Sequence, residues 1–326
     1  MIKASVIIPI YNTGKKVLPL LNELKSQCND NIEILLINDC SSDNTLEILK
    51  KFLSNVHTLN IKLISLKKNH GVSYARNIGI QNARGRYLIF VDSDDEIRKN
   101  FLEKYVKTIE LSNNDIEFFS MKSKSTGKVY PIYSDGLSDS KLDQADLLKL
   151  YARQELAGYP FLYISKRKLW SENAFNVSIS YQEDLLALIE MIISNPNIKG
   201  SVNNSSYYIY SDNNKKNKLN NLKSSDYWEA VKNDLSISKL IYENKKTSIL
   251  YQEVLSHILS SLINLIGFSL LKGNMDDYYI ARKKYLDIYH KAKIYKNNRL
   301  KRNIQYILLK YNFLQLLIFL SRRKMK

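Results

Sequence analysis

The chain has few of the residues that build metal or disulfide centres. Its 326 residues include two cysteines, Cys28 and Cys40, and neither belongs to a Cys-x-x-Cys or Cys/His cluster. Both are therefore expected to be structural thiols. The four histidines, at positions 57, 70, 257 and 290, lack metal-ligand spacing, and no Ser/His/Asp arrangement is recognisable. A zinc-type site and a serine-nucleophile site are thus not expected.

Long hydrophobic runs are missing as well. No apolar run reaches the roughly 18 to 20 residues that a membrane-spanning helix needs. The N-terminus enters a β-like run directly, without the charged and apolar segments of a signal peptide. These absences predict a cytoplasmic protein. The balance of 44% hydrophobic and 25% charged residues is typical of a globular chain with a sizeable core.

Acidic residues are scarce relative to basic ones. The chain has 49 Lys and Arg against 32 Asp and Glu, and the net charge of +17 indicates anionic partners. The excess is concentrated in residues 291–326, which hold eleven Lys or Arg and no acid. Because the charge lies in this tail and no nucleic-acid-binding motif is recognisable, a nucleic-acid partner is not expected.

Apolar runs alternate with segments of helical spacing in the first 120 residues. The apolar runs are mostly continuous, which is typical of strands covered on both faces. They lie at residues 5–8, 32–37, 61–64 and 87–91, and the helical segments lie at 17–24, 46–52 and 75–83. The pattern predicts an α/β fold with a mainly parallel sheet flanked by helices. Ligands of such sheets bind beyond the carboxyl ends of the strands.

The domain organisation follows from changes in composition. The pattern loosens after residue 120, with helices expected at 143–151 and 183–193 and a strand at 159–165. A polar stretch at 211–221 then precedes a region rich in Leu, Ile, Tyr and Lys. We predict one domain over 1–215, divided into two halves at 1–120 and 121–215. A basic helical region is predicted over 216–326.

A cluster of carboxylates follows the fourth apolar run. Asp92, Asp94 and Asp95 lie within four residues, with Ser93 among them. Their charges repel unless a cation or hydrogen-bond donors offset them. Hard oxygen ligands suit Mg²⁺ or Mn²⁺, whose shell is often completed by substrate phosphates. The alternative is a solvated acidic turn that caps the helix beginning near Asn100.

Asp39 ends the second apolar run and is the next candidate. A carboxylate at a strand end can accept the ring N–H of a pyrimidine. Ser41, Ser42 and Asp43 resemble N-cap residues of the following helix, and a capping role is the alternative for the whole segment.

Five ordered motifs together resemble the donor-binding half of family 2 glycosyltransferases. They are residues 6–12 (VIIPIYN), 37–43 (INDCSSD), 69–79 (NHGVSYARNIG), 83–87 (ARGRY) and 90–95 (FVDSDD). The resemblance covers residues 3 to 120 densely. It implies that 1–215 is a catalytic domain, with 1–120 as its nucleotide-sugar half and 121–215 as its acceptor half. One departure is Asn38, where many relatives have Asp; Asp39 keeps the position of the base contact.

The resemblance implies a GT-A fold, an inverting mechanism, a UDP-sugar donor and Mn²⁺ or Mg²⁺. It implies a hexose or N-acetylhexosamine transferred to a glycan or lipid-linked saccharide in the synthesis of a bacterial surface polysaccharide such as capsule, O-antigen or lipooligosaccharide. Carried over by position, the resemblance implies donor-site roles for seven residues. Pro9 and Tyr11 line the nucleotide pocket, Asp39 binds uracil, and Arg76 lies near the nucleotide and the acidic motif. In that motif Asp92 lies beside the ribose, Ser93 belongs to the donor-binding set, and Asp94 binds the metal. For Arg76 the alternative is a structural ion pair with the acidic loop.

Inversion by direct displacement needs a carboxylate outside the metal cluster to take the acceptor proton. Glu183 and Asp184 begin an apolar-faced helix and are similar to the Glu-Asp motif of family 2 enzymes. Asp184 matches the base, and Glu183 a supporting or acceptor-binding residue. The alternative is that both acids favour the positive end of the helix.

The basic tail holds an apolar stretch, residues 313–320, that is too short to span a bilayer. One expectation is that this stretch lies in the plane of an anionic membrane surface, so that the protein is peripheral on the inner face of the cytoplasmic membrane. The alternative is that the stretch packs on the protein itself. The helical tail also offers a surface for a homodimer.

Two rival functions fit the residues less well. A nucleotidyltransferase would need a Gly-rich, basic loop after the first strand, and residues 9–14 (PIYNTG) do not form one. A catalytically inactive nucleotide-sugar or glycan-binding module is the alternative function, which the retention of Asp39, Asp94 and Asp184 disfavours.

Overall fold

The computed structural model describes residues 1–56, 60–131, 133, 141–153, 155–212, 222–243, 248–292 and 296–313. The chain divides into two compact units, each with its own core. Unit 1 comprises Met1–Gln144, Ala157–Ile179 and Glu183–Lys216, and unit 2 comprises Ala145–Leu156, Ser180–Gln182 and Asn217–Lys326. The boundary expected near residue 215 stays a prediction, but two short segments before it group with the helical unit.

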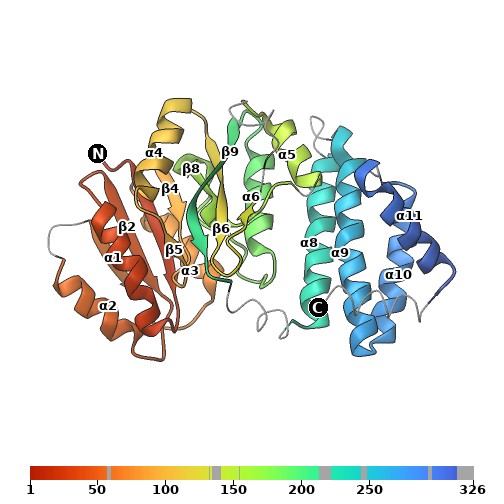
Figure 1. Ribbon diagram of the computed structural model, residues 1–326, viewed down its shortest axis with the longest axis horizontal. Helices are drawn as coiled ribbons and strands as arrows, with labels where there is room; N and C mark the ends of the chain where they lie inside the picture. The colour runs from red at the N-terminus through yellow and green to blue at the C-terminus, as the bar shows by residue number, and fades with distance from the viewer. Residues whose placement is uncertain are drawn as a thin grey trace. The chain divides into compact units, whose positions relative to one another are not determined.

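Unit 1 is a mixed sheet flanked by helices (Figure 1). Its strands are β1 (Ala4–Ile10), β2 (Ile32–Asn38), β3 (Ile61–Ser65), β4 (Tyr87–Phe90), β5 (Glu96–Ile97), β6 (Ile116–Ser123), β7 (Val129–Tyr130), β8 (Tyr163–Lys166) and β9 (Gly200–Tyr210). Its helices are α1 (Leu18–Gln27), α2 (Thr45–Ser54), α3 (Val72–Asn82), α4 (Phe101–Ser112) and α6 (Glu183–Ser194). The α/β class and the early strands and helices expected from the sequence are confirmed.

The described strands follow the order β3-β2-β1-β4-β8-β6-β9-β5, with β7 beside β6. The first four strands pair in parallel, whereas β8 runs antiparallel to both β4 and β6. Strands β6 and β9 were not expected, because polar residues interrupt their apolar pattern. The sheet is therefore parallel across β3, β2, β1 and β4 and mixed beyond them.

Both faces of the parallel half are covered. All seven residues of β1 and of β2 are buried, as their continuous apolar sequences predict. On one face, Val6 and Ile8 share a core with residues of α1, α2 and α4. On the other face, α3 lies so close to β1 that a Cβ on Gly79 would come 2.3 Å from a methyl group of Ile7. Glycine is thus needed at this crossing of helix and strand.

The register of the parallel strands brings the polar motifs to one edge of the sheet. Ile10 pairs with Asn38, and Ile7 pairs with Phe90. Tyr11, Asp39 and Asp92 closely follow these strand ends. The expected meeting of the motifs at the carboxyl edge is confirmed.

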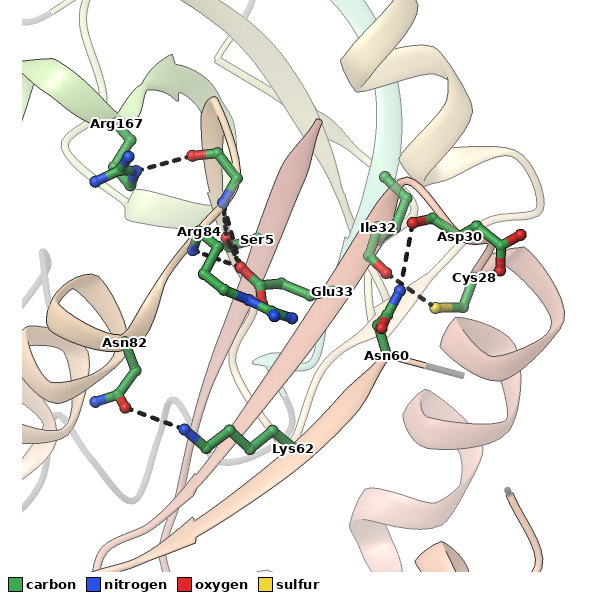
Figure 2. A network of polar contacts seen from close by, with 11 residues as sticks. Ser5, Cys28, Asp30, Ile32, Glu33, Asn60, Lys62, Asn82, Arg84 and Arg167 are labelled. Carbon is green, nitrogen blue, oxygen red and sulfur yellow. Dashed lines mark hydrogen bonds and ion pairs between the residues drawn. The ribbon is translucent and has the colours of Figure 1, made fainter. Parts of the chain in front are cut away.

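A buried polar network holds the opposite edge of the sheet (Figure 2). Glu33 is buried and accepts hydrogen bonds from the Ser5 hydroxyl at 2.6 Å and from the Arg84 backbone N–H at 2.6 Å. The Gly85 N–H donates to Ser5 Oγ at 2.9 Å, and Arg167 Nε donates to the Gly85 carbonyl at 2.9 Å. The 83–87 motif is therefore a structural element that ties β1, β2 and β4 together.

Unit 2 is helical. It contains most of α5 (Gln144–Ala152), together with α8 (Ser224–Glu243), α9 (Tyr251–Lys272), α10 (Met275–Tyr289) and α11 (Lys296–Lys310). The helical C-terminal region expected from the sequence is confirmed for the described residues.

Helix α9 forms the centre of this unit. Ile258, Leu259 and Leu262 are fully buried, because α9 contacts both α8 and α10. Among the described helices, α9 is long and apolar enough to cross a membrane by length and composition alone, although polar residues interrupt its apolar sequence. In its most apolar window, 67% of the helix is buried within the protein. Such burial is typical of a core helix, whose apolar side chains are covered by its neighbours.

A polar cluster lies inside the same unit. Buried Asp234 of α8 accepts from Tyr151 Oη at 3.1 Å and from Ser261 Oγ at 2.5 Å. It also lies 3.0 Å from His257 Nδ1. The cluster joins α5, α8 and α9, so these hydrogen bonds fix the mutual register of three helices.

Candidate active site

The carboxylates of the acidic loop after β4 (Asp92, Asp94 and Asp95) differ in exposure. Asp94 is exposed, whereas Asp95 is 3% exposed. Asp95 accepts from Tyr208 Oη at 2.6 Å and from the Ser211 N–H at 2.7 Å. Burial, followed by the charge of Asp92, raises the pKa of Asp95 to about 8. Asp95 is therefore an internal anchor, and Asp94 is the carboxylate placed to meet a ligand.

Tyr208 of β9 also contacts the backbone of the acidic loop. Tyr208 is fully buried, and its hydroxyl accepts the backbone N–H of Asp92 at 3.1 Å while it donates to Asp95. Ser93 is also buried. Helix α4 has Asn100 as its N-cap, so the acidic loop does not cap that helix as the alternative interpretation required. Sequence reasoning missed Tyr208, since nothing in residues 203–210 marks it.

Arg76 joins the acidic loop to the start of α6. Its side chain is 5% exposed, with Nη2 3.3 Å from Asp92 Oδ1 and Nη1 3.1 Å from Glu183 Oε1. The guanidinium carbon lies 5.3 Å from the centre of the Phe175 ring. The ion pair weighed from the sequence is thus present, and it has a second acidic partner that the sequence did not reveal.

Asp184 lies beside this ion-pair bridge. Burial and the neighbouring Glu183 carboxylate raise the pKa of Asp184 to about 7, and the positive charge of Arg76 opposes the rise. Both acids occupy the first turn of α6, where the helix dipole favours negative charge. Asp184 Oδ1 also accepts the backbone N–H of Leu185 at 2.8 Å. A carboxyl group with a pKa near neutrality is suited to accept and release protons.

Asp39 follows β2 and organises the loop before α3. It is buried and accepts the backbone N–H groups of His70 at 2.9 Å and of Gly71 at 2.7 Å. Gly71 has a φ of +89°, which glycine adopts without strain. The two oxygens retain acceptor capacity beyond these bonds. A uracil contact by Asp39 stays a prediction.

The loops after β1 and β2 are tied to each other. Asn12 Oδ1 accepts the N–H of Ser42 at 2.8 Å, and Asn38 Oδ1 accepts the Ser41 hydroxyl at 2.6 Å. Asp43 accepts the N–H of Thr45, the first residue of α2, at 3.0 Å. Asp43 therefore satisfies a backbone donor at the start of the helix, although the N-cap position is Asn44 rather than one of the three residues expected from the sequence.

Pro9 and Tyr11 differ in accessibility. Pro9 is buried within β1 and pairs with Ile37, whereas Tyr11 is 48% exposed immediately after the strand. Tyr11 therefore has a ring available for a base or sugar, and Pro9 shapes the strand end behind it. Their contact with a nucleotide stays a prediction.

The carboxylates fit a divalent cation held in part by its substrate. Among the described residues, no group of three His, Cys, Asp or Glu side chains is placed to enclose a metal ion. Asp94 is exposed and the Asp92 side chain is 30% exposed, so these two offer oxygen ligands at the loop surface. Mg²⁺ and Mn²⁺ are commonly bound by one or two carboxylates plus phosphate oxygens.

A cavity of about 410 Å³ lies away from these residues. Lys3, Gln27, Asn31 and Asn100 are among the residues that line it, and none of the candidate site residues does. The candidate site residues therefore lie apart from this cavity.

Residues 5–157 match the family described as glycosyl transferase family 2. The chain is therefore similar to this family over just under half of its length. It is 37% identical over 125 residues to the poly(ribitol-phosphate) beta-N-acetylglucosaminyltransferase TarS of Staphylococcus aureus, a match that covers 37% of this chain and 21% of TarS. It is 28% identical over 252 residues to TarP of the same species, a match that covers 75% of this chain and 73% of TarP.

The fold is similar to that of a solved structure. The crystal structure of S. aureus TarS 1–349 in complex with UDP-GlcNAc has a TM-score of 0.70 at 21% sequence identity, and the match covers 99% of this chain and 90% of that chain. This likeness establishes the GT-A fold with a helical C-terminal region, as expected. The match to full-length TarS spans only about a fifth of that protein's length.

Proposed function

We propose that this protein is an inverting glycosyltransferase that moves a hexose or N-acetylhexosamine from a UDP-sugar to a saccharide or lipid-linked saccharide of a bacterial surface glycan. The observation that carries the proposal is the Arg76 bridge, which brings the acidic loop and the start of α6 together through contacts of 3.3 Å and 3.1 Å. The Arg76 guanidinium lies between Asp92 of the acidic loop and Glu183, the residue that precedes the proposed base Asp184.

In this mechanism Asp184 accepts the proton of an acceptor hydroxyl. The hydroxyl oxygen forms a bond to the anomeric carbon while the bond from that carbon to the UDP oxygen breaks, and UDP leaves with the electron pair. The configuration at the anomeric carbon inverts. Glu183 keeps Arg76 in place and orients the acceptor.

Asp94, with Asp92 beside it, would hold Mn²⁺ or Mg²⁺. When bound, the metal supplies positive charge that stabilises the departing diphosphate. Tyr11 and Asp39 would bind the uridine, Asp92 would lie beside the ribose, Ser93 would contribute to the donor site and Pro9 would support the pocket. Since TarS and TarP are named as N-acetylglucosaminyltransferases, UDP-N-acetylglucosamine is the first donor to test.

The test is UDP release by the purified protein from a panel of UDP-sugars, with Mn²⁺, Mg²⁺ or EDTA. Asp94→Ala and Asp184→Asn should each lose activity, while Glu190→Gln, a carboxylate-to-amide change in the same helix as Asp184, should retain it. Metal-dependent release with this pattern would establish the transferase. UDP-sugar binding without turnover toward any saccharide acceptor would instead support the inactive binding module.

A further inference from the structure

Helix α11 has a buried face and an exposed apolar face. Leu308 and Leu309 are buried and belong to the core of unit 2. On the same helix, Ile304 and Ile307 are 47% and 48% exposed, and Tyr311, which follows the helix, is 63% exposed. The last three side chains, hereafter the outer stripe, are spaced by three and four residues, so they line one side of the helix.

Basic residues flank the outer stripe. Lys301 and Lys310 are exposed, and the Lys310 ammonium lies 5.6 Å from the centre of the Tyr311 ring. Residues 291–326 contain eleven Lys or Arg and no acid, so no carboxylate of this segment offsets their charge. Arg302 points the other way: it is buried and donates to the Ser256 carbonyl at 3.5 Å.

We propose that the outer stripe and its lysines form a docking surface for an anionic phospholipid bilayer. An apolar stripe bordered by cations suits the boundary between headgroups and acyl chains, where the isoleucines leave water and the lysines meet anionic headgroups. Residues 314–326, which hold most of the apolar stretch noted in the sequence, lie outside the described residues and are not needed for this argument.

A second copy of the chain is a poorer occupant of this surface. Two copies joined through the outer stripe would bring two sets of lysines together without acids from this segment to pair with them. A bilayer supplies both the missing apolar phase and the missing negative charge. This inference is independent of the proposed transferase activity, because it uses no residue of the donor or acceptor sites.

The test is cosedimentation of the full chain with vesicles of phosphatidylglycerol mixed with phosphatidylcholine, and with vesicles of phosphatidylcholine alone. We expect binding to the anionic vesicles that weakens with salt. Lys301→Gln and Lys310→Gln should each reduce the partition coefficient about fivefold at low salt. Ile304→Gln combined with Ile307→Gln should reduce it about tenfold or more.

Matched controls lie in unit 1. Leu111→Gln removes a side chain that is 76% exposed, and Lys51→Gln removes an exposed lysine; both should bind vesicles like the unchanged protein. Circular dichroism melting would show that the α11 variants remain folded. Equal sedimentation of all variants, equal binding to both vesicle types, or a dimer that dissociates on the isoleucine substitutions would each overturn the proposal.

Discussion

Arg76 Nη1 donates to Glu183 Oε1 at 3.1 Å, although 107 residues separate the two along the chain. The other guanidinium nitrogen reaches Asp92 at 3.3 Å. One buried cation therefore sets the distance between the acidic loop and the start of α6. Both side chains of this ion pair are largely shielded from solvent, since Arg76 is 5% exposed and Glu183 is 13% exposed.

Replacing Arg76 should change both the stability of the protein and the acidity of the base. Arg76→Gln leaves two carboxylates without their cation, so the free energy of unfolding should fall by about 3 kcal/mol. Because Arg76 lowers the pKa of Asp184, its loss should also move the midpoint of the pH–rate profile upward. Urea unfolding and the pH dependence of kcat/KM measure the two effects.

Arg98→Gln is the control for that experiment, because Arg98 is exposed. It should change neither the unfolding midpoint nor the profile. A profile that stays fixed in Arg76→Gln would show that Arg76 has only a structural role.

The rate should depend on pH through Asp184, whose pKa is raised to about 7 by burial and by Glu183. A base must be deprotonated, so kcat/KM should fall as the pH drops through about 7. Stability should respond in the opposite sense. The folded pKa lies above the unfolded one, so the contribution of this carboxyl to stability is present below the unfolded pKa and is lost as the pH rises through about 7.

Asp184→Asn separates these two responses. It should lower kcat/KM by about 10²-fold or more at neutral pH, while thermal unfolding above pH 7 should occur at a temperature no lower than in the unchanged protein. Glu190→Gln should keep the pH midpoint near that of the unchanged protein. A flat rate profile in the unchanged protein across the neutral range would argue against Asp184 as the base.

Removing one hydroxyl should loosen the acidic loop. Tyr208→Phe deletes the group that accepts the Asp92 N–H and donates to Asp95, which should cost about 1 to 3 kcal/mol of unfolding free energy. The metal concentration needed for half-maximal activity should rise as well, because Asp94 lies in the same loop. Tyr207→Phe is the neighbouring control, and its effects should be small. Unchanged metal dependence in Tyr208→Phe would separate Tyr208 from ligand binding.

Gly85 lies at the edge of the sheet opposite the candidate site, and a side chain at this position should destabilise the protein. A Cβ there would lie 2.5 Å from the Ser5 nitrogen and 2.6 Å from the Ala4 carbonyl carbon. Gly85→Ala should therefore cost about 1 to 3 kcal/mol of unfolding free energy, measured by urea denaturation, with little change in KM for the donor. Gly127→Ala isolates the backbone effect, because Gly127 has a φ of +70° and its Cβ would meet only the Lys122 side chain, at 3.8 Å. A cost for Gly85→Ala below that of Gly127→Ala would contradict the steric argument.

Local sequence signals predicted the first half of the fold and brought the candidate site residues to one edge of the sheet. The continuous apolar runs of β1 and β2 predict strands covered on both faces, and the polar residues after them predict a ligand edge. Strands β6 and β9 carried no such signal, because side chains such as Asn204 and Ser205 interrupt the apolar pattern of β9. Pairing with neighbouring strands decides their structure, and that pairing is not local.

The sequence by itself determined which residues gather at the carboxyl edge of the sheet, because parallel strands end at the same edge. Only the tertiary structure decided how exposed each carboxylate is and which groups surround it. Asp94 and Asp95 are neighbours in the chain, yet Asp95 is buried against Tyr208 of β9 while Asp94 remains exposed. Asp184 likewise owes its raised pKa to burial and to charges around it. Burial and charge depend on segments that are distant in sequence, and the folded chain alone brings them together.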